Sequence, residues 1–343
     1  METPKSYTKI FIVLLIVLVV CFFLNICLGS VSIPFKDVVA AILEDNSTKS
    51  SWQHIIINYR IPKAVTALLV GSGLGISGLL MQTLFRNPLA GPYVLGLSSG
   101  ASLGVAIVIL GSSLFGGAFS AVLLTKWSLV IASSIGSFLV LLAVILVSIK
   151  VKDTMAILII GLMFASVTAA IVNMLSYFST AEQLQRYVFW SFGSLGNLSW
   201  NELLILSVIY LIGLILTIFS IKSLNALLLG DHYAKSLGLN IKKARFIIIV
   251  ATSCLAGSIT AFAGPIAFIG LAVPHLTKLI FDTSNHRILV PAVLFSGSIL
   301  MLICDSIAQL PTSEYTLPIN AVTSLVGAPV IIWLLMRKKK MFV

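Results

Sequence analysis

The sequence is poor in charge. Only 10% of its 343 residues are Asp, Glu, Lys or Arg, whereas 59% are hydrophobic, and the mean hydropathy is +1.10. Soluble domains contain about 25% charged residues, and a chain this apolar could not cover its own surface with polar groups. The scarcity of charge therefore excludes a soluble globular domain and indicates an integral membrane protein.

Several chemical signatures are also missing from the sequence. The dipeptide Gly-Lys does not occur, which excludes the P-loop pattern G-x-x-x-x-G-K-[ST] and ATP hydrolysis by such a loop. The four cysteines have no zinc or haem spacing and the four histidines are dispersed, so we expect no resident metal and no cofactor. The net charge of +11 comes from residues scattered in short loops, which argues against a nucleic-acid partner.

Acidic residues are almost absent from the apolar runs. Asp305 is the one acid inside such a run, and it lies near the outer end of that run. Proton-coupled carriers need acids or histidines within the membrane, so a secondary carrier that acts alone has little support. It stays an alternative.

Ten apolar runs could cross the roughly 30 Å hydrocarbon core, which takes about 20 helical residues. The seventh and eighth merge, and Gly264-Pro265 is the expected break, because proline removes a donor and clashes with the preceding turn. The eighth is short and contains Pro274, which allows a broken or partly re-entrant helix. The first is too long for a signal-peptide core of roughly 7–15 residues, so we expect a retained span. The runs cover approximately residues 10–28, 64–85, 93–115, 127–149, 155–178, 203–221, 246–262, 265–280, 290–308 and 319–336.

The basic residues between these runs predict the orientation. With a cytoplasmic N-terminus, sixteen of the 22 Lys and Arg residues fall in inner segments and six in outer segments. Ten spans then place both termini in the cytoplasm, and the sequence RKKK at residues 337–340 fits an inner anchor.

Two short patterns match catalytic or nucleotide-binding motifs. GLGISG matches G-x-G-x-x-G but lacks the strand of a dinucleotide site, and Gly71 with Gly75 forms the G-x-x-x-G spacing that brings membrane helices close together. GLSSG matches the nucleophile-elbow pattern, and His275 is the one histidine inside an apolar run. An intramembrane serine hydrolase is therefore an alternative, although we assign Ser98 to helix packing.

The longest inner loop, residues 222–245, predicts a short helix at the cytoplasmic face. Gly230 and Asp231 can end one helix and begin the next, with Asp231 as N-cap. Gly238 can end this short helix. Its apolar side chains, Leu237 among them, fit two surfaces equally: the headgroup layer of the membrane and a groove on a soluble partner.

The segment FRNPLAGP, residues 85–92, is polar and helix-breaking although it lies between two apolar runs. The predicted orientation places it at the cytoplasmic ends of the second and third runs. Pro88 and Pro92 can end one helix and begin the next. A plain connecting loop would explain these features.

Several segments together resemble the FecCD-type permease family of bacterial ABC importers for iron siderophores, haem or cobalamin. They extend in order from residue 60 to residue 335, and their combination is highly specific. The resemblance implies a type II ABC importer permease fold: a single all-α transmembrane domain over residues 1–343, with ten helices in an inverted repeat. The segments are RIPKAVTALLVGSGLGISGLLMQTLFRNPLAGP with LGLSSGASLG, LGDHYAKSLGL, AFAGPIAFIGLAVPHLTKLI, NHRILVP and LPINAVTSLVGAPVIIWLL.

The resemblance also implies partners. It predicts a homodimer around a central pathway, two copies of a separate ATPase subunit, and a periplasmic or lipid-anchored substrate-binding protein. The chain itself would be a transport subunit and not an enzyme. Residues 222–245 would dock into the ATPase, which selects the soluble partner over the headgroup layer. The matching coupling residues are Gly230, Asp231, Ala234, Leu237 and Gly238.

The resemblance assigns an inner gate to the proline-containing loop. Asn87 and Leu89 match the positions that line this gate, and Thr154 at the head of the fifth run matches another. Prolines make physical sense there because they hold a loop in one shape.

The outer side has two positions that match docking residues of the family. Arg60 and Lys63 match basic positions that meet acids of the binding protein, whereas Gln309 stands where a compared member has a third arginine. We therefore expect the permease subunit of an ATP-driven importer in a bacterial inner membrane. It would carry a bulky metal chelate by alternating access, and the sequence does not identify the chelate.

Overall fold

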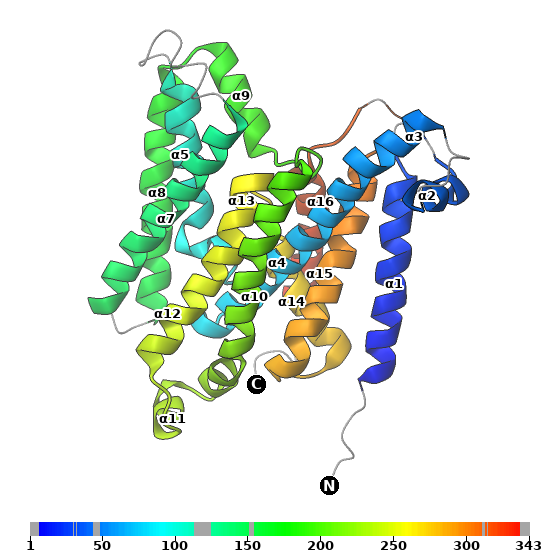
Figure 1. Ribbon diagram of the computed structural model, residues 1–343. Helices are drawn as coiled ribbons and strands as arrows, with labels where there is room; N and C mark the ends of the chain where they lie inside the picture. The colour runs from blue at the N-terminus through cyan, green and yellow to red at the C-terminus, as the bar shows by residue number, and fades with distance from the viewer. Residues whose placement is uncertain are drawn as a thin grey trace. The chain divides into compact units, whose positions relative to one another are not determined.

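The computed structural model of the chain describes residues 7–29, 31, 33–43, 49–112, 125–150, 154–310, 313 and 315–336. Within these residues every regular element is helical (Figure 1). The α-helices are α1 (Thr8–Cys27), α2 (Phe35–Ile42), α3 (Ser50–Ile55), α4 (Ile61–Phe85), α5 (Leu97–Leu110), α7 (Lys126–Lys150), α8 (Thr154–Tyr177), α9 (Ala181–Ser191), α10 (Trp200–Leu228), α11 (Asp231–Ser236), α12 (Ile241–Thr252), α13 (Ser258–Ala263), α14 (Ile269–Phe281), α15 (His286–Ala308) and α16 (Ile319–Met336). The π-helical segments η1 (Ile56–Arg60) and η4 (Ser253–Gly257) and the 3-10 helix η2 (Pro92–Leu95) join some of them.

Seven described helical stretches are long and apolar enough to cross a membrane. Three shorter apolar helices, in α5, α14 and α16, coincide with the third, eighth and tenth predicted runs. The all-helical membrane class is therefore confirmed, and each predicted run contains a helix, but the count of ten spans stays a prediction. The seven stretches are Thr8–Cys27, Ser50–Phe85, Lys126–Val144, Ala156–Tyr177, Trp200–Leu228, Ile241–Ala263 and His286–Ala308.

The seventh and eighth runs separate where the sequence predicts. α13 ends at Ala263, and Gly264 has a φ of 78°, in the region that favours glycine. The chain has no regular structure from there to Ala267, and α14 begins at Ile269. α14 then continues through Pro274 as one helix of 13 residues, so this proline does not break it.

Besides α11, which the sequence predicts in the loop of residues 222–245, three short helices lie outside the predicted runs among the described residues: α2, α3 and α9. α9 begins with a capping box: Thr180 Oγ1 accepts a hydrogen bond from the Gln183 backbone N–H at 3.4 Å, and Gln183 Oε1 accepts one from the Thr180 N–H at 3.0 Å. The pattern T-x-x-Q is a local signal for a helix start. Because α9 is amphipathic and not uniformly apolar, a search for long apolar runs overlooks it.

The chain divides into two compact units. Unit 1 comprises Met1–Ile76, Leu195–Leu204 and Ala267–Val343, and unit 2 comprises Ser77–Ser194 and Ile205–Ile266. Each unit has its own helix contacts. The single domain predicted for residues 1–343 stays a prediction.

Unit 1 is built on a close contact between α4 and α15. A Cβ added at Gly71 would overlap the carbonyl oxygen of Gly297, and one added at Gly297 would overlap that of Gly71. At the same crossing, Ser298 Oγ donates a hydrogen bond to the Leu68 carbonyl oxygen over 3.0 Å. The small residues let the two backbones meet, as the G-x-x-x-G spacing predicts.

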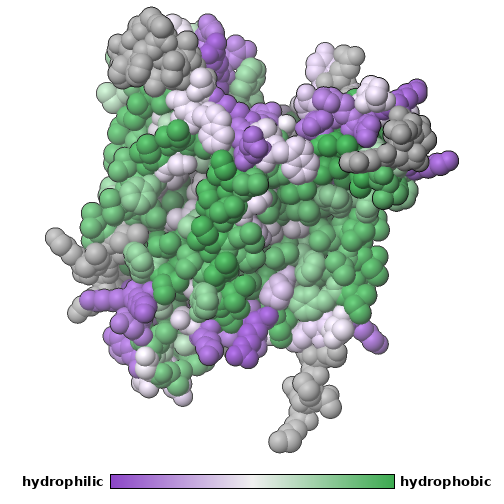
Figure 2. All heavy atoms as spheres, viewed as in Figure 1, coloured by the Kyte–Doolittle hydropathy of each residue, from purple (hydrophilic) through white to green (hydrophobic). Residues whose placement is uncertain are grey.

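Helix α1 packs along α15 in unit 1. The Phe11 ring lies 5.0 Å from the Phe281 ring and 6.2 Å from the Phe295 ring, measured between ring centroids. The rest of α1 is largely exposed and apolar, with Ile12 and Ile16 among the exposed side chains. Figure 2 shows hydrophobic side chains along α1 and hydrophilic ones near α2 and α3. Such a helix requires a lipid environment.

In unit 2, α5 and α7 likewise pack closely at small residues. A Cβ at Gly100 would meet the Gly136 carbonyl oxygen at 2.5 Å, and one at Gly104 would overlap the Ala132 carbonyl oxygen. Ser137 Oγ donates a hydrogen bond to the Leu97 carbonyl oxygen at 3.0 Å. The small residues of the segment SSGASLG therefore bring two backbones together.

Candidate functional site

The loop that follows α4 is held in one conformation by local hydrogen bonds. Arg86 has a φ of 45°, which turns the chain sharply after Phe85. Asn87 Oδ1 accepts a hydrogen bond from the Leu89 N–H at 2.9 Å, and the Asn87 carbonyl oxygen accepts one from the Ala90 N–H at 3.0 Å. These bonds form an Asx-type turn. The Leu89 side chain is 47% exposed at this turn.

Arg86 ties this loop to the start of α11. Its Nε donates a hydrogen bond to the Leu227 carbonyl oxygen at 3.1 Å, and its Nη2 pairs with Asp231 Oδ1. The other carboxylate oxygen, Asp231 Oδ2, accepts from Arg245 Nη2 at 2.7 Å. One carboxylate thus joins the loop after α4, the N-terminus of α11 and the first turns of α12. We call these three side chains the Asp231 clamp.

Helix α11 is short but well terminated. Gly230, with a φ of 105°, is its N-cap, and Gly238, with a φ of 81°, follows its C-cap. The Leu239 N–H donates to the Ala234 carbonyl oxygen at 3.0 Å, and the Gly238 N–H donates to the Lys235 carbonyl oxygen at 2.9 Å. This pair of bonds is the Schellman motif. The prediction that Gly238 lies just beyond the helix end is confirmed.

The expected role of Asp231 as N-cap is wrong. α11 begins at Asp231 itself, and Gly230 occupies the N-cap position. The two arginine partners explain the difference, because they draw the carboxylate away from the α11 backbone. At the first position of the helix the negative charge still interacts favourably with the helix dipole.

One side of α11 packs inward and the other presents apolar groups outward. Ala234 is fully buried, whereas Tyr233 is 62% and Leu237 61% exposed. Leu229, just before the helix, is 61% exposed as well. The structure thus holds Gly230, Asp231, Ala234, Leu237 and Gly238 in one compact turn-helix-turn segment. Thr154, the third predicted gate residue, is the first residue of α8, and its side chain lies outside the described residues.

The two predicted docking residues are in unit 1, and both have partners within the chain. Arg60 Nη1 donates hydrogen bonds to the carbonyl oxygens of Ile26 at 2.6 Å and Cys27 at 3.0 Å, and its Nη2 donates to that of Val31. Ile26 and Cys27 are the last residues of α1, whose final carbonyl groups have no partner within the helix. Arg60 therefore caps α1.

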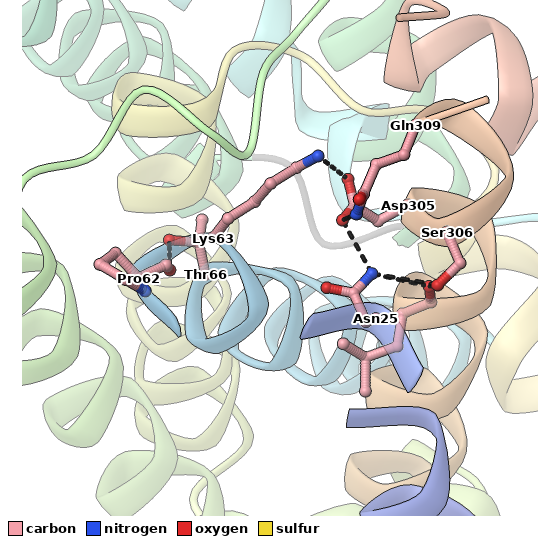
Figure 3. A network of polar contacts seen from close by, with 8 residues as sticks. Asn25, Pro62, Lys63, Thr66, Asp305, Ser306 and Gln309 are labelled. Atoms are coloured by element: carbon pink, nitrogen blue, oxygen red, sulfur yellow. Dashed lines mark hydrogen bonds and ion pairs between the residues drawn. The ribbon is translucent and has the colours of Figure 1, made fainter. Parts of the chain in front are cut away.

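Lys63 belongs to a buried polar network around Asp305 (Figure 3). Its Nζ lies 3.1 Å from Asp305 Oδ1. Asp305 Oδ2 accepts hydrogen bonds from Asn25 Nδ2 at 2.9 Å and Gln309 Nε2 at 2.8 Å, and Asn25 also donates to Ser306 Oγ at 3.1 Å. We call this set the Asp305 network. It joins α1, α4 and α15 around a carboxylate whose side chain is 3% exposed.

The Asp305 network explains why an acid is tolerated in an apolar run. A buried carboxylate needs a cation and hydrogen-bond donors to offset its loss of water, and Lys63, Asn25 and Gln309 supply them. Gln309, the residue at the expected third docking position, is 8% exposed and faces Asp305. Sequence reasoning missed these partners, since nothing local connects residues 25, 63 and 305.

Comparisons with known proteins agree over almost the whole chain. The model of the FecCD transport family matches residues 17–337. The hemin transport system permease protein HmuU of Yersinia pestis is 35% identical over 329 residues, which cover 95% of each chain. The vitamin B12 import system permease protein BtuC of Klebsiella pneumoniae is 34% identical over 327 residues, which cover 95% of this chain and 93% of BtuC.

A solved structure has the same fold. It is described as an inward-facing conformation of a transporter of the metal-chelate ABC type. It has a TM-score of 0.83 and 31% sequence identity to this chain, and the match covers 96% of this chain and all of the other. The relatives compared are transport permeases, which is consistent with a transport subunit and gives the hydrolase alternative no support. The chain belongs to the FecCD transport family.

Proposed function

We propose that this chain is the membrane-spanning permease subunit of an ATP-binding-cassette importer that carries a bulky metal chelate across a bacterial inner membrane by alternating access. The family match and the two permease relatives support the permease role. The likeness to a transporter of the metal-chelate ABC type supports the importer class over a carrier that acts alone. Ferric siderophores are the chelates that we propose first, with haem and cobalamin as alternatives.

The proposed assembly contains the subunits that this chain would need for ATP-driven import. ATP hydrolysis requires a separate subunit, since the chain has no P-loop lysine. We propose a homodimer with two copies of an ATPase subunit, and a periplasmic or lipid-anchored binding protein on the outer face. Both termini would be cytoplasmic, as the distribution of Lys and Arg predicts.

The observation that carries the proposal is the uncovered apolar side of α11. Tyr233 and Leu237 stand exposed on a helix whose two ends are fixed by Gly230 and by the Schellman motif at Gly238. A rigid helix with apolar anchors suits a groove on a partner protein. We propose that α11 is the coupling helix and that the ATPase covers it.

The Asp231 clamp gives this coupling a physical route. A displacement of α11 acts on Asp231, whose ion pair with Arg86 leads directly to the loop that holds Asn87 and Leu89. Because the Asx-type turn keeps this loop in one shape, a pull on Arg86 would move the loop as a body. We propose that Asn87 and Leu89, together with Thr154, form the inner gate.

We propose that Arg60 and Lys63 dock the binding protein on the outer face while they keep their partners within the chain. Both side chains have partners within the chain, and Lys63 is 23% exposed. A carboxylate of the binding protein would therefore share Lys63 with Asp305. Exposed ion pairs contribute about 0.2–1 kcal/mol each, so such contacts would affect the association rate and register more than the affinity.

The test begins with the chain purified from its native membrane through an affinity tag. An ABC ATPase should co-purify, and proteoliposomes with this complex and the binding protein should take up an iron chelate when ATP is present inside. Competition among ferric siderophores, hemin and cobalamin then ranks the substrates.

Leu237→Glu is the decisive variant, since a charge on α11 should abolish ATPase co-purification while leaving the fold intact. Tyr315→Glu is the control, because Tyr315 is an exposed residue of unit 1, with 81% exposure against 61% for Leu237. A Leu237→Glu complex that assembled and transported like the wild type would contradict the assignment of α11.

A further inference from the structure

Unit 2 contains a polar cavity that none of the proposed roles uses. It has a volume of about 320 Å³ and lies between α5, α8 and α9. Seven of its ten lining residues are polar and uncharged, and the other three are Ala169, Val172 and Pro265. The polar set consists of six hydroxyl groups, from Ser98, Ser99, Ser102, Thr168, Ser176 and Tyr187, and the amide of Asn173.

Several of these polar groups have no partner among the described residues. Thr168 Oγ1 donates to the Ala165 carbonyl oxygen at 2.9 Å, and the Tyr187 hydroxyl pairs with Ser102. By contrast, the side chains of Ser98, Asn173 and Ser176 form no hydrogen bond within the part of the chain that the structure describes. All three residues line the cavity.

Such open groups are costly in a membrane-spanning helix. Asn173 and Ser176 belong to α8, which is one of the candidate spans. In an apolar medium an amide without a hydrogen bond costs about 2–7 kcal/mol, depending on the reference state. Asn173 is exposed and Ser98 and Ser176 are half-buried, so water or a ligand in the cavity can reach their polar groups. Polar residues inside spans accordingly mark substrate pathways and water-filled cavities. Sequence reasoning assigned Ser98 to packing, but its side chain lines this cavity.

The chemistry of the lining selects a ligand. The lining holds no acid, histidine or cysteine that would bind a metal ion directly, and no Lys or Arg that would pair with carboxylates. Burial raises the pKa of Tyr187, so its phenol stays protonated at neutral pH. Neutral donors and acceptors of this kind suit the carbonyl and hydroxamate oxygens on the surface of a ferric chelate. The flat apolar face of a haem fits these polar groups poorly, because it offers them no hydrogen bond.

We propose that this cavity is a substrate subsite that contacts the transported chelate through neutral hydrogen bonds, and that the favoured substrates are ferric hydroxamates. The proposal rests on the proposed importer function. A volume of about 320 Å³ is at the lower end of ligand pockets, which span about 300–1,000 Å³. The cavity therefore holds one edge of a chelate and not the entire molecule. Asn173 is its specificity-determining residue.

Binding to the purified permease tests the site without its partners. Trp190 is a natural reporter, because its ring centroid lies 6.3 Å from that of Tyr187. Ferric desferrioxamine B, a trihydroxamate, should quench tryptophan fluorescence, and Trp190→Phe should remove most of this signal. Asn173→Leu should weaken binding about three- to tenfold, as expected for the loss of one neutral hydrogen bond. Met174→Leu is the matched control, since Met174 is adjacent on α8, 64% exposed and outside the cavity lining.

Uptake by the complete complex in proteoliposomes provides the second readout. Asn173→Leu should raise the KM for ferric desferrioxamine B by the same factor and leave hemin uptake unchanged. Equal losses for both chelates would indicate a structural role and overturn the proposal, as would unchanged quenching in the variant. Wild-type uptake of hemin without uptake of the hydroxamate would contradict the substrate class. A complex that couples no ATP hydrolysis to uptake counts against the importer function, whereas the binding assay still decides the site.

Discussion

Asp305 in unit 1 and Asp231 in unit 2 both join separate helices, but their surroundings differ. Asp305 is 3% exposed and is held by Lys63, Asn25 and Gln309. Asp231 is 36% exposed and is held by two arginines, of which Arg86 is 44% exposed. Removing one partner of a buried ion pair costs about 3–5 kcal/mol, whereas an exposed pair contributes about 0–1 kcal/mol.

This difference assigns the two aspartates different roles. The buried Asp305 network fixes α1, α4 and α15 together, since opening it would leave a charge without water. The Arg86–Asp231 pair of the clamp can open and close at little cost, because Arg86 is 44% exposed and water can replace it, whereas Arg245 is 17% exposed and holds the carboxylate more firmly. The proposed alternation between two states would need both kinds of contact. The predictions below test the contrast from the largest expected effect on stability to the smallest.

Asp305→Ala should cause the largest loss of stability. It leaves the Lys63 ammonium and the amides of Asn25 and Gln309 without their shared acceptor. We expect a loss of about 3 kcal/mol, the lower end for buried pairs, because Lys63 retains some exposure. A lower midpoint of thermal denaturation in detergent would show it. The double variant Lys63→Met with Asp305→Asn should recover most of the loss, and a stable Asp305→Ala protein would contradict the role of this network.

Gly71→Ala should cause the second-largest loss of stability, because the added Cβ would overlap the Gly297 backbone. Overpacking of this kind costs about 1–3 kcal/mol. Gly100→Ala should cost a similar amount in unit 2, since its Cβ would meet Gly136. Gly257→Ala is the control, because a Cβ there meets nothing within 4 Å. Equal denaturation midpoints for Gly71→Ala and Gly257→Ala would contradict the claim that the close α4–α15 contact is important for stability.

Gly238→Ala should destabilise α11 locally. Gly238 has a φ of 81°, and a left-handed conformation costs a residue with a side chain about 1–2 kcal/mol. Faster amide hydrogen exchange in α11, with an unchanged global midpoint, is the expected result. Ser236→Ala is the control on the same helix, since the Ser236 hydroxyl donates its hydrogen bond to the His232 carbonyl oxygen within α11. Exchange in Gly238→Ala as slow as in the wild type would argue that the helix end is not fixed by this glycine.

Arg86→Ala should have the smallest effect on stability, about 0.2–1 kcal/mol, because its pair with Asp231 is exposed. Arg245→Ala should cost more, since the Arg245 side chain is 17% exposed. Each removes one partner of Asp231, but only Arg86 belongs to the loop of the proposed inner gate. Uptake per ATP hydrolysed should therefore fall in Arg86→Ala and stay near the wild-type value in Arg245→Ala. If both variants coupled equally well, the clamp would not be the route from α11 to the gate.

Much of the fold could be predicted from the sequence because the signals are local. The break at Gly264-Pro265 and the helix end at Gly238 depend on the backbone preferences of one or two residues. The family segments identified the permease class, and the match over residues 17–337 confirms it. The gate, coupling and docking residues stay predictions.

Other features could not be predicted because their causes are distant in the chain. The N-cap assignment for Asp231 followed a local rule, and two arginines from other segments overrode it. Arg60 and Lys63 matched docking positions, but nothing in the sequence indicated that one caps α1 and the other pairs with Asp305. α9 was missed although its capping box was visible in the sequence.

The order of residues is enough to predict membrane-spanning helices and their ends, because the length of an apolar run and the backbone preferences of glycine and proline act over a few residues, and the matching segments indicate the FecCD transport family. Which polar groups meet became clear only from the packing of the helices. Lys63 and Asp305 meet because Gly71 and Gly297 let α4 and α15 approach closely, and Asn25 reaches Asp305 because α1 packs along α15. Inside a membrane such groups must be paired or solvated, and which partner each takes depends on how the helices pack, which the order of residues does not state.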